Sequence, residues 1–253
     1  MDLGIQDKIA VVTGAGKGIG GAIARALAEE GARVMTTDID ETLARETAEA
    51  IGAAGGRAFP FALDVTSRKD VAKLFGSIRS SHGPIDILVN NAGILRRQPT
   101  ATVTDEEWDV VEGVNFRGAR YCCQEVMEEM RERRWGRIVN IVSLVIKMIG
   151  RIDVASYATS KAALGALTKI LAKDLGEFGV TVNAVLPGSI ALTDFNNDVG
   201  YPKDTKLMPG MSIPVGRRGT PEDVAPTVAF LCSQKAGYIT GEFIDVNGGL
   251  LMD

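Results

Sequence analysis

The sequence of 253 residues contains a single histidine, His82. A Ser-His-Asp triad needs a histidine as its base, and histidine-rich metal sites need several, so this scarcity effectively excludes both kinds of site. The three cysteines, Cys122, Cys123 and Cys232, form no CxxC motif and cannot all pair with one another. We therefore expect reduced cysteines buried in helices, and we expect no bound metal ion.

The sequence also lacks long apolar segments and a strong net charge. No apolar run reaches the roughly 18 residues that span a bilayer, and the amino-terminal stretch lacks the basic and apolar regions of a secretion signal. The formal net charge of -4 and the pI near 5.3 disfavour binding to nucleic acid or to an anionic membrane. These observations predict a cytoplasmic protein with neither kind of partner.

Short apolar runs alternate with segments of helical periodicity along the chain. The pattern predicts strands at residues 8–13, 33–37, 57–63, 84–89, 137–142, 180–186 and 243–246. It predicts helices at residues 18–30, 41–54, 71–80, 105–134 with an interruption near 113–118, 156–177 and 221–232. The expected fold class is α/β: a single-domain Rossmann fold over residues 1–253, with a doubly wound, parallel seven-stranded sheet and helices on both faces. The long segment at about 188–219 is expected to be a substrate loop.

A glycine-rich turn, TGAGKGIG at residues 13–20, joins the first expected strand to the first expected helix. Gly14, Gly18 and Gly20 permit a tight turn, a close approach of the backbone to a pyrophosphate, and close packing of helix on strand. The amino end of the helix adds unpaired N–H groups and a favourable dipole for phosphate. Glycine-rich turns also exist for backbone reasons alone, but the position of this one predicts a dinucleotide site.

Asp38 ends the second expected strand, 18 residues after Gly20. A carboxylate at this place can accept hydrogen bonds from the adenosine ribose and repel a 2′-phosphate, which favours NAD over NADP. Lys17 argues for NADP, because a cation in the glycine turn attracts that phosphate. We give Asp38 more weight, since Lys17 has a flexible stem and can turn to solvent. The alternative for Asp38 is a helix cap ahead of Glu41.

Tyr157 and Lys161 lie four residues apart in an expected helix, so they project from the same face. Free tyrosine has a pKa near ~10, and an ammonium group a few ångströms away can lower that pKa by roughly 1–3 units. Such a pair can donate and accept a proton near neutral pH, as reversible oxidation of an alcohol requires. Because lysine is common, the spacing alone is a weak signal.

Together these motifs make the chain resemble the short-chain dehydrogenase/reductase family nearly from end to end. The matching features, in chain order, are TGAGKGIG at residues 13–20, Asp64-Val65, NNAG at residues 90–93, Asn115, Ser143, YATSK at residues 157–161, Pro187-Gly188, Thr240-Gly241 and NGG at residues 247–249. Chance would have to supply each piece in the right order, so the constellation is specific.

The resemblance implies a role for each matching residue. It implies that Tyr157 is the general acid/base and that Ser143 hydrogen-bonds the substrate oxygen. Lys161 would bind the nicotinamide ribose and lower the Tyr157 pKa, and Asn115 would hold a water in a proton relay. The Ile190 backbone would meet the nicotinamide carboxamide. The implied cofactor-binding residues are Gly14, Lys17, Gly18, Ile19, Gly20, Asp38, Asp64, Val65, Asn91, Ala92, Gly93, Tyr157, Lys161, Pro187, Gly188 and Ile190.

Two features depart from the family pattern. Ser143 precedes Tyr157 by 14 residues, where many members have 13, so we expect a loop over the site that is one residue longer. The threonine usually found five places after Pro187 is replaced by Leu192, and Thr193 follows one place later. A cofactor contact of Thr193 is therefore left open.

Arginines indicate a substrate class. Arg96 and Arg97 follow the NNAG segment, and Arg151 lies six residues before Tyr157. Both patterns resemble family members that oxidise sugar acids, and the arginine fork matches a carboxylate; surface charges or subunit contacts are the alternative reading of these arginines. The predicted function is an NAD-dependent oxidoreductase that interconverts a secondary alcohol and a ketone, on a sugar acid or a polyol.

Other functions compete with this one. The glycine motif and the carboxyl-terminal TGEFIDVNGG favour a 3-oxoacyl-[acyl-carrier-protein] reductase, and Arg133 and Arg134 suit an acidic carrier. Against it, Asp38 disfavours NADP, and Phe178 stands where an arginine is frequent. An apolar alcohol such as a steroid is suggested by Leu144, Val145, Ile146, Met148, Met208 and Met211. A nucleotide-sensing protein with the same fold is the non-enzymatic alternative, and the resemblance also implies a homotetramer.

Overall fold

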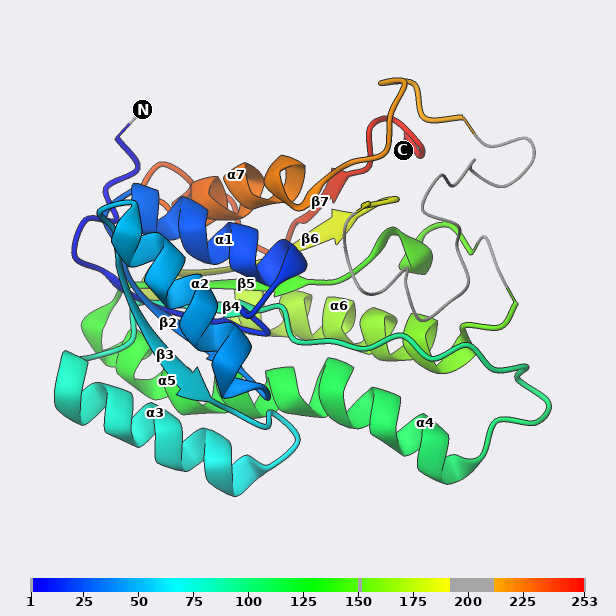
Figure 1. The fold of residues 1–253 in the computed structure, drawn as a ribbon, viewed down its shortest axis with the longest axis horizontal. Helices are drawn as coiled ribbons and strands as arrows, with labels where there is room; N and C mark the ends of the chain where they lie inside the picture. The colour runs from blue at the N-terminus through cyan, green and yellow to red at the C-terminus, as the bar shows by residue number, and fades with distance from the viewer. Residues whose placement is uncertain (1, 150–151, 192–211, 253) are drawn as a thin grey trace.

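All seven strands predicted from the sequence occur in the part of the chain that the structure describes, and they form one parallel sheet. The structure is a computed structural model that describes residues 2–149, 152–191 and 212–252. The strands are β1 (Ile9–Thr13), β2 (Arg33–Asp38), β3 (Arg57–Ala62), β4 (Ile87–Asn90), β5 (Gly136–Ile141), β6 (Val180–Pro187) and β7 (Phe243–Val246). Their order is β3-β2-β1-β4-β5-β6-β7 (Figure 1), which confirms the doubly wound α/β fold.

Helices cover both faces of this sheet (Figure 1). One face carries α1 (Gly18–Glu29), α2 (Glu41–Ala53) and α7 (Pro221–Leu231), and the other carries α3 (Arg68–His82), α4 (Asp105–Glu112), α5 (Ala119–Arg133) and α6 (Ala155–Leu175). Successive strand residues point to opposite faces. Val34 therefore joins the apolar cluster with α1 and α7, whereas Met35 joins the cluster with α3, α5 and α6.

The expected interruption of the long helix is a π-helical turn, Gly113–Gly118, between α4 and α5. A Cβ on Gly118 would lie 2.8 Å from the Cβ of Val65, so the turn packs closely only because this side chain is absent. Helix α3 begins three residues earlier than predicted, because the Ser67 hydroxyl accepts a hydrogen bond from the Asp70 amide and caps the helix. Helix α6 gives way to a 3₁₀ turn, Gly176–Phe178.

The three cysteines are free and buried, as predicted. Burial raises the pKa of Cys123 and of Cys232 to about 12, and it raises the pKa of Cys122 well above its usual value. Among the described residues, no group of three or more His, Cys, Asp or Glu side chains is placed to hold a metal ion. No helix in the described parts of the chain is long and apolar enough to cross a membrane.

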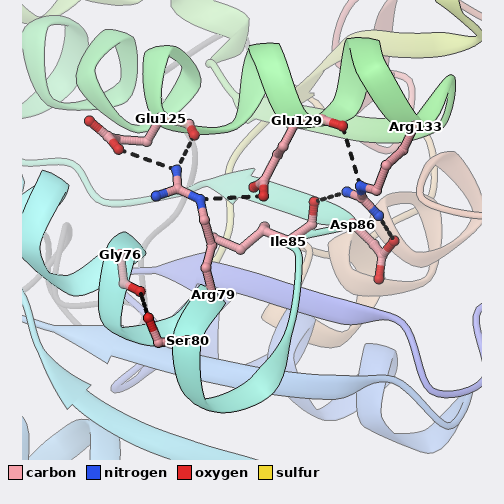
Figure 2. Close-up of polar contacts among 8 residues, drawn as sticks. All are labelled: Gly76, Arg79, Ser80, Ile85, Asp86, Glu125, Glu129 and Arg133. Carbon is pink, nitrogen blue, oxygen red and sulfur yellow. Dashed lines mark hydrogen bonds and ion pairs between the residues drawn. The ribbon is translucent and has the colours of Figure 1, made fainter.

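An ionic network joins α3, α5 and the chain that enters β4 (Figure 2). Arg79 on α3 contacts two carboxylates of α5, those of Glu125 at 3.2 Å and Glu129 at 3.3 Å. At the carboxyl end of α5, Arg133 donates to the Asp86 carboxylate over 2.7 Å. Because Arg79 and Arg133 hold opposite ends of the network, α5 is fixed in register against α3 and the sheet.

Asp86 carries the buried part of this network. One carboxylate oxygen accepts from Arg133, and the other accepts from the Ile9 amide over 2.9 Å, with the Asp86 side chain 9% exposed. Replacing Asp86 with Ala removes the carboxylate partner of Arg133 and the acceptor of the Ile9 amide, so we expect a loss of about 3 kcal/mol in the free energy of unfolding, measured by urea titration. The control is Asp109→Ala, which breaks an exposed pair with Arg117 and should cost less than about 1 kcal/mol. Equal losses in the two variants would contradict the assignment.

Candidate active site

The site forms where β1 and β4 end side by side at the point where the strand order reverses. The Thr13 hydroxyl accepts hydrogen bonds from the Asn91 amide at 3.0 Å and the Ala92 amide at 3.1 Å. The Asn91 side chain donates in return to the carbonyls of Thr13, at 3.0 Å, and Gly14, at 2.9 Å. Asn91 and Ala92 are predicted cofactor contacts, and the hydrogen bonds that the structure gives them hold the glycine turn in place.

The glycine turn has the shape that a pyrophosphate needs. Gly14 has a φ of 63°, a conformation that favours glycine. A Cβ on Gly20 would lie 2.1 Å from the Gly14 carbonyl oxygen, so helix and strand approach closely only without it. Helix α1 begins at Gly18, next to Ile19, and no side chain caps its amino end. Bare backbone and free helical N–H groups together fit a dinucleotide phosphate.

Asp38 lies beside this turn. One oxygen of its carboxylate accepts from the Gly16 amide at 3.0 Å, and the other accepts from the Asp40 amide at 3.1 Å. The alternative that Asp38 caps the next helix is wrong, because Asp40 is the residue that caps α2, through the Thr42 amide. Lys17 is exposed. The Asp38 carboxylate thus contacts the glycine turn and does not cap a helix.

Asp64, Val65 and Gly93 complete the predicted cofactor side. The Asp64 carboxylate accepts from the amide and the hydroxyl of Thr66, at 2.9 and 2.7 Å. Val65 is buried against the π-helical turn. A Cβ on Gly93 would lie 3.2 Å from the Asn115 side-chain oxygen and 3.3 Å from Lys161 Nζ, so Gly93 leaves room between the cofactor side and the catalytic side.

Tyr157 and Lys161 lie on α6, and Ser143 follows β5 at the same edge of the sheet. The Ser143 hydroxyl is hydrogen-bonded to Tyr157. It also accepts from the Val145 amide at 3.2 Å and so starts the 3₁₀ turn Leu144–Ile146. Lys161 Nζ lies 6.0 Å from the Tyr157 ring centroid and donates to the Ile141 carbonyl at 2.7 Å. Three of the four predicted catalytic groups therefore converge.

The predicted lowering of the Tyr157 pKa by Lys161 is not what the structure shows. Burial raises the pKa of Tyr157 above its ordinary value of 10.0, and the hydrogen bond from Ser143 only partly opposes this. Burial also lowers the pKa of Lys161 from 10.5 to about 8. The reason is desolvation: both charged forms, phenolate and ammonium, lose water in the same packed region, so both residues shift towards neutrality.

Asn115, the fourth predicted catalytic residue, lies in the π-helical turn and is fully buried. Its side-chain oxygen accepts from the Ile94 amide at 2.8 Å, and its amino group donates to the Ile94 carbonyl at 3.0 Å and to the Ser160 hydroxyl at 3.1 Å. The side chain thus ties the segment after β4 to α6 next to Lys161. This positioning contact was not foreseen, and the predicted proton relay stays a prediction.

The end of β6 contributes Pro187, Gly188 and Ile190. A Cβ on Gly188 would lie 2.7 Å from the Asn247 Cβ, which explains the glycine. Ile190 is buried, and it forms an isolated parallel β-bridge with Gly219. The bridge joins the two ends of the predicted substrate loop. Leu192, Thr193, Met208 and Met211 lie outside the described residues, so nothing places them.

The arginines predicted to bind substrate are only partly placed. Arg96 is exposed, Arg97 is partly buried, and Arg151 lies outside the described residues. The segment that carries Arg96 and Arg97 runs beside the chain just before Tyr157, because the Gln98 amide donates to the Asp153 carbonyl at 2.9 Å. The structure therefore brings the segment after Arg97 beside the chain at Asp153, and the binding of substrate by Arg96, Arg97 and Arg151 stays a prediction.

One ion pair near the site gave no signal in the sequence. Lys147 Nζ lies 2.6 Å from the Asp245 carboxylate, which ties the turn after Ser143 to β7. The two residues are 98 positions apart in the sequence and belong to no motif, so only the fold shows that they meet.

Comparisons with known proteins agree with this geometry. Residues 14–251 match the family model described as enoyl-(acyl carrier protein) reductase. The chain is 41% identical to the short-chain reductase protein NovJ of Streptomyces niveus, over 96% of this chain and 94% of that protein. It is 41% identical to the 3-oxoacyl-[acyl-carrier-protein] reductase FabG of Aquifex aeolicus, over 99% of this chain and all of that protein, and 39% identical to FabG of Escherichia coli, again over 99% and 100%.

A solved structure also resembles the chain over nearly its whole length. It comes from Beutenbergia cavernae, is provisionally named an NAD(P)-dependent gluconate 5-dehydrogenase, and contains NADP at low occupancy. The TM-score is 0.90 and the sequence identity 34%, with 99% of both chains covered.

The buried Lys161 predicts how stability depends on pH. Its pKa is about 8 in the folded protein and roughly 10.4 in an unfolded chain, so between those values the unfolded chain binds more protons. Relative to Lys161→Met, which cannot titrate, the free energy of unfolding of the wild type should therefore rise from about pH 8 to about pH 10, by up to about 1.4 kcal/mol per pH unit. Urea titrations across this range measure the difference, and parallel curves would contradict the buried-lysine assignment.

Proposed function

The chain belongs to the short-chain dehydrogenase/reductase family and is an NAD(P)-dependent oxidoreductase that acts on CH–OH groups, and on that premise we propose that it uses NAD to interconvert a secondary alcohol and a ketone. The observation that carries the proposal is the hydrogen bond between Ser143 and Tyr157, with Lys161 Nζ 6.0 Å from the tyrosine ring, next to the glycine turn. The uncapped helix and the bare glycine backbone support a dinucleotide beside them.

In the proposed mechanism, Tyr157 moves the proton and Ser143 holds the substrate oxygen. During oxidation the Tyr157 oxygen takes the hydroxyl proton, and during reduction it returns the proton to the carbonyl oxygen. The bound nicotinamide accepts or supplies the hydride. Tyr157 is protonated at neutral pH, because its pKa lies above the ordinary value of 10.0, and this is the form that donates a proton to a ketone oxygen. A protonated Lys161 on the same helix face offsets part of the cost of forming the phenolate.

The cofactor contacts follow the arrangement of the strands. We propose that Gly14, Gly18, Ile19 and Gly20 receive the pyrophosphate, and that Lys161 holds the nicotinamide ribose. Asp64 and Val65 would receive the adenine, while the Ile190 backbone would meet the carboxamide at the end of β6. The absence of side chains in the glycine turn supports this assignment. A Cβ on Gly16, for example, would lie 2.8 Å from the Asp38 carboxylate, so the backbone there can lie close to its neighbours only as glycine.

Sugar acids or polyols are the proposed substrates. Arg96 and Arg97 lie on a segment that runs beside the one leading into Tyr157, and an arginine fork binds a carboxylate through two parallel hydrogen bonds. The solved structure from Beutenbergia cavernae, named for gluconate, supports the same class.

The second candidate is a 3-oxoacyl-[acyl-carrier-protein] reductase, because FabG proteins near 40% identity align with the whole chain. The Arg134 guanidinium lies 5.9 Å from the Phe178 ring and could receive an acidic carrier. Arg133 is paired with Asp86 instead, and Arg131 is paired with Glu128 and Asp174. A homotetramer and a cytoplasmic location remain predictions. Val110 on α4 and Ile170 on α6 are 40% and 64% exposed and are consistent with a subunit contact.

The cofactor preference is tested at Asp38. A carboxylate near a 2′-phosphate costs roughly 1–4 kcal/mol, so Asp38→Ser should raise kcat/KM for NADP relative to NAD by about tenfold or more. Asp40→Ser is the matched control, because it removes a nearby carboxylate that caps α2, and serine also caps a helix. A wild type that prefers NADP would refute the role given to Asp38.

The reaction itself is tested at Tyr157. Tyr157→Phe removes the proton donor and keeps the ring, so turnover should fall by at least about a hundredfold while NAD affinity changes little. NADH absorbance is followed with gluconate-type acids, polyols, a 3-oxoacyl thioester and a steroid alcohol, and NAD binding is measured by calorimetry. Retention of more than a few per cent of activity would show that Tyr157 is not the acid/base. Wild-type NAD binding without turnover on any of these compounds would favour the sensing alternative.

A further inference from the structure

Arg218 contacts the chain just after β6. Its Nε donates to the Ser189 hydroxyl at 3.0 Å, and its Nη2 donates to the Ile190 carbonyl at 3.0 Å. The backbone adds to this contact, because the Gly219 amide donates to the Ser189 carbonyl at 3.0 Å and the Ala191 amide donates to the Gly219 carbonyl at 2.8 Å. The guanidinium group thus binds the Ser189 side chain and the carbonyl of the Ile190–Ala191 peptide at the same time.

The segment that carries Arg218 is itself anchored to α7. Arg217 forms a two-pronged ion pair with Asp223, at 2.6 and 2.7 Å, and Thr220 and Asp223 form a capping box at the start of the helix. Gly219 packs so closely that a Cβ would lie 2.6 Å from the Ile190 side chain. Arg218 therefore links the start of α7 to the Ser189 side chain and to the Ile190 carbonyl.

We propose that Arg218 is a positioning residue that sets the nicotinamide end of the cofactor site. This inference rests on the proposed function, in which the Ile190 backbone meets the carboxamide. The Arg218 cation holds the Ile190 carbonyl from one side and thereby fixes the orientation of the adjoining peptide. The adenosine and pyrophosphate contacts lie on β1, β2 and α1, at the other side of the site, and do not depend on Arg218.

The test separates the two ends of the cofactor. Dissociation constants for NAD and for ADP-ribose, which lacks the nicotinamide, are measured by calorimetry for the wild type and Arg218→Met. We expect NAD binding to weaken by about tenfold and ADP-ribose binding to change by less than about twofold. In turnover, the deuterium isotope effect on hydride transfer should rise, because a misaligned ring slows that step.

Two further variants guard against a general loss of structure. Ser189→Ala removes one acceptor and keeps Arg218, so it should shift the NAD to ADP-ribose ratio in the same direction by a smaller factor. Arg57→Met is the matched control: Arg57 also donates to a backbone carbonyl, that of Gly31 at 2.9 Å, but it lies at the amino end of β3. Its ratio should equal that of the wild type.

Each outcome decides the proposal. Equal weakening of NAD and ADP-ribose in Arg218→Met, or no change in either, would overturn the role of Arg218 while leaving the proposed function intact. Failure of the wild type to bind NAD would overturn the proposed function and this assignment together. If Arg218→Met does not fold, Ser189→Ala alone decides, and an unchanged ratio in that variant counts against the proposal.

Discussion

The structure depends on the seam where β1 and β4 end together. Thr13 and Asn91 exchange four hydrogen bonds with each other's segments across this seam, and they fix the glycine turn relative to the chain that follows β4. Because the strands are parallel, every carboxyl end opens at the same edge of the sheet. The seam therefore sets the distance between the groups that can hold a dinucleotide and the groups on α6 that can move a proton.

Desolvation is the second constraint, and it acts on both members of the proposed catalytic pair. Tyr157 and Lys161 are each pushed towards their neutral forms by the protein packed around them. A charge created there during a reaction is stabilised by fixed donors such as Ser143 rather than by water. Lys161 is buried, and the apolar cluster that includes Val142 and Leu164 comes from the same elements as Ser143 and Lys161.

Much of this arrangement could be predicted from the sequence, because local patterns encode it. The glycine turn, the Tyr157–Lys161 spacing and the interruption near Asn115 are all short-range features, and each appears where it was expected. Contacts between distant segments could not be predicted in the same way. Neither the pairing of Lys147 with Asp245 nor the grip of Arg218 on Ser189 has a periodic or spaced signal. The direction of the Tyr157 pKa shift was missed because spacing reveals a neighbouring charge but not the depth of burial.

The burial of all three cysteines affects how the protein should respond to oxidants. Peroxide and electrophiles attack the thiolate, and a thiol with a pKa of about 12 carries almost none of it at cellular pH. Cys122 and Cys123 are adjacent and Cys232 is far along the chain, yet all three are closed to solvent. The proposed mechanism uses a tyrosine and a lysine but no thiol, so turnover should continue under conditions that inactivate enzymes with a reactive cysteine. Covalent inhibitors directed at thiols should not react with the folded protein.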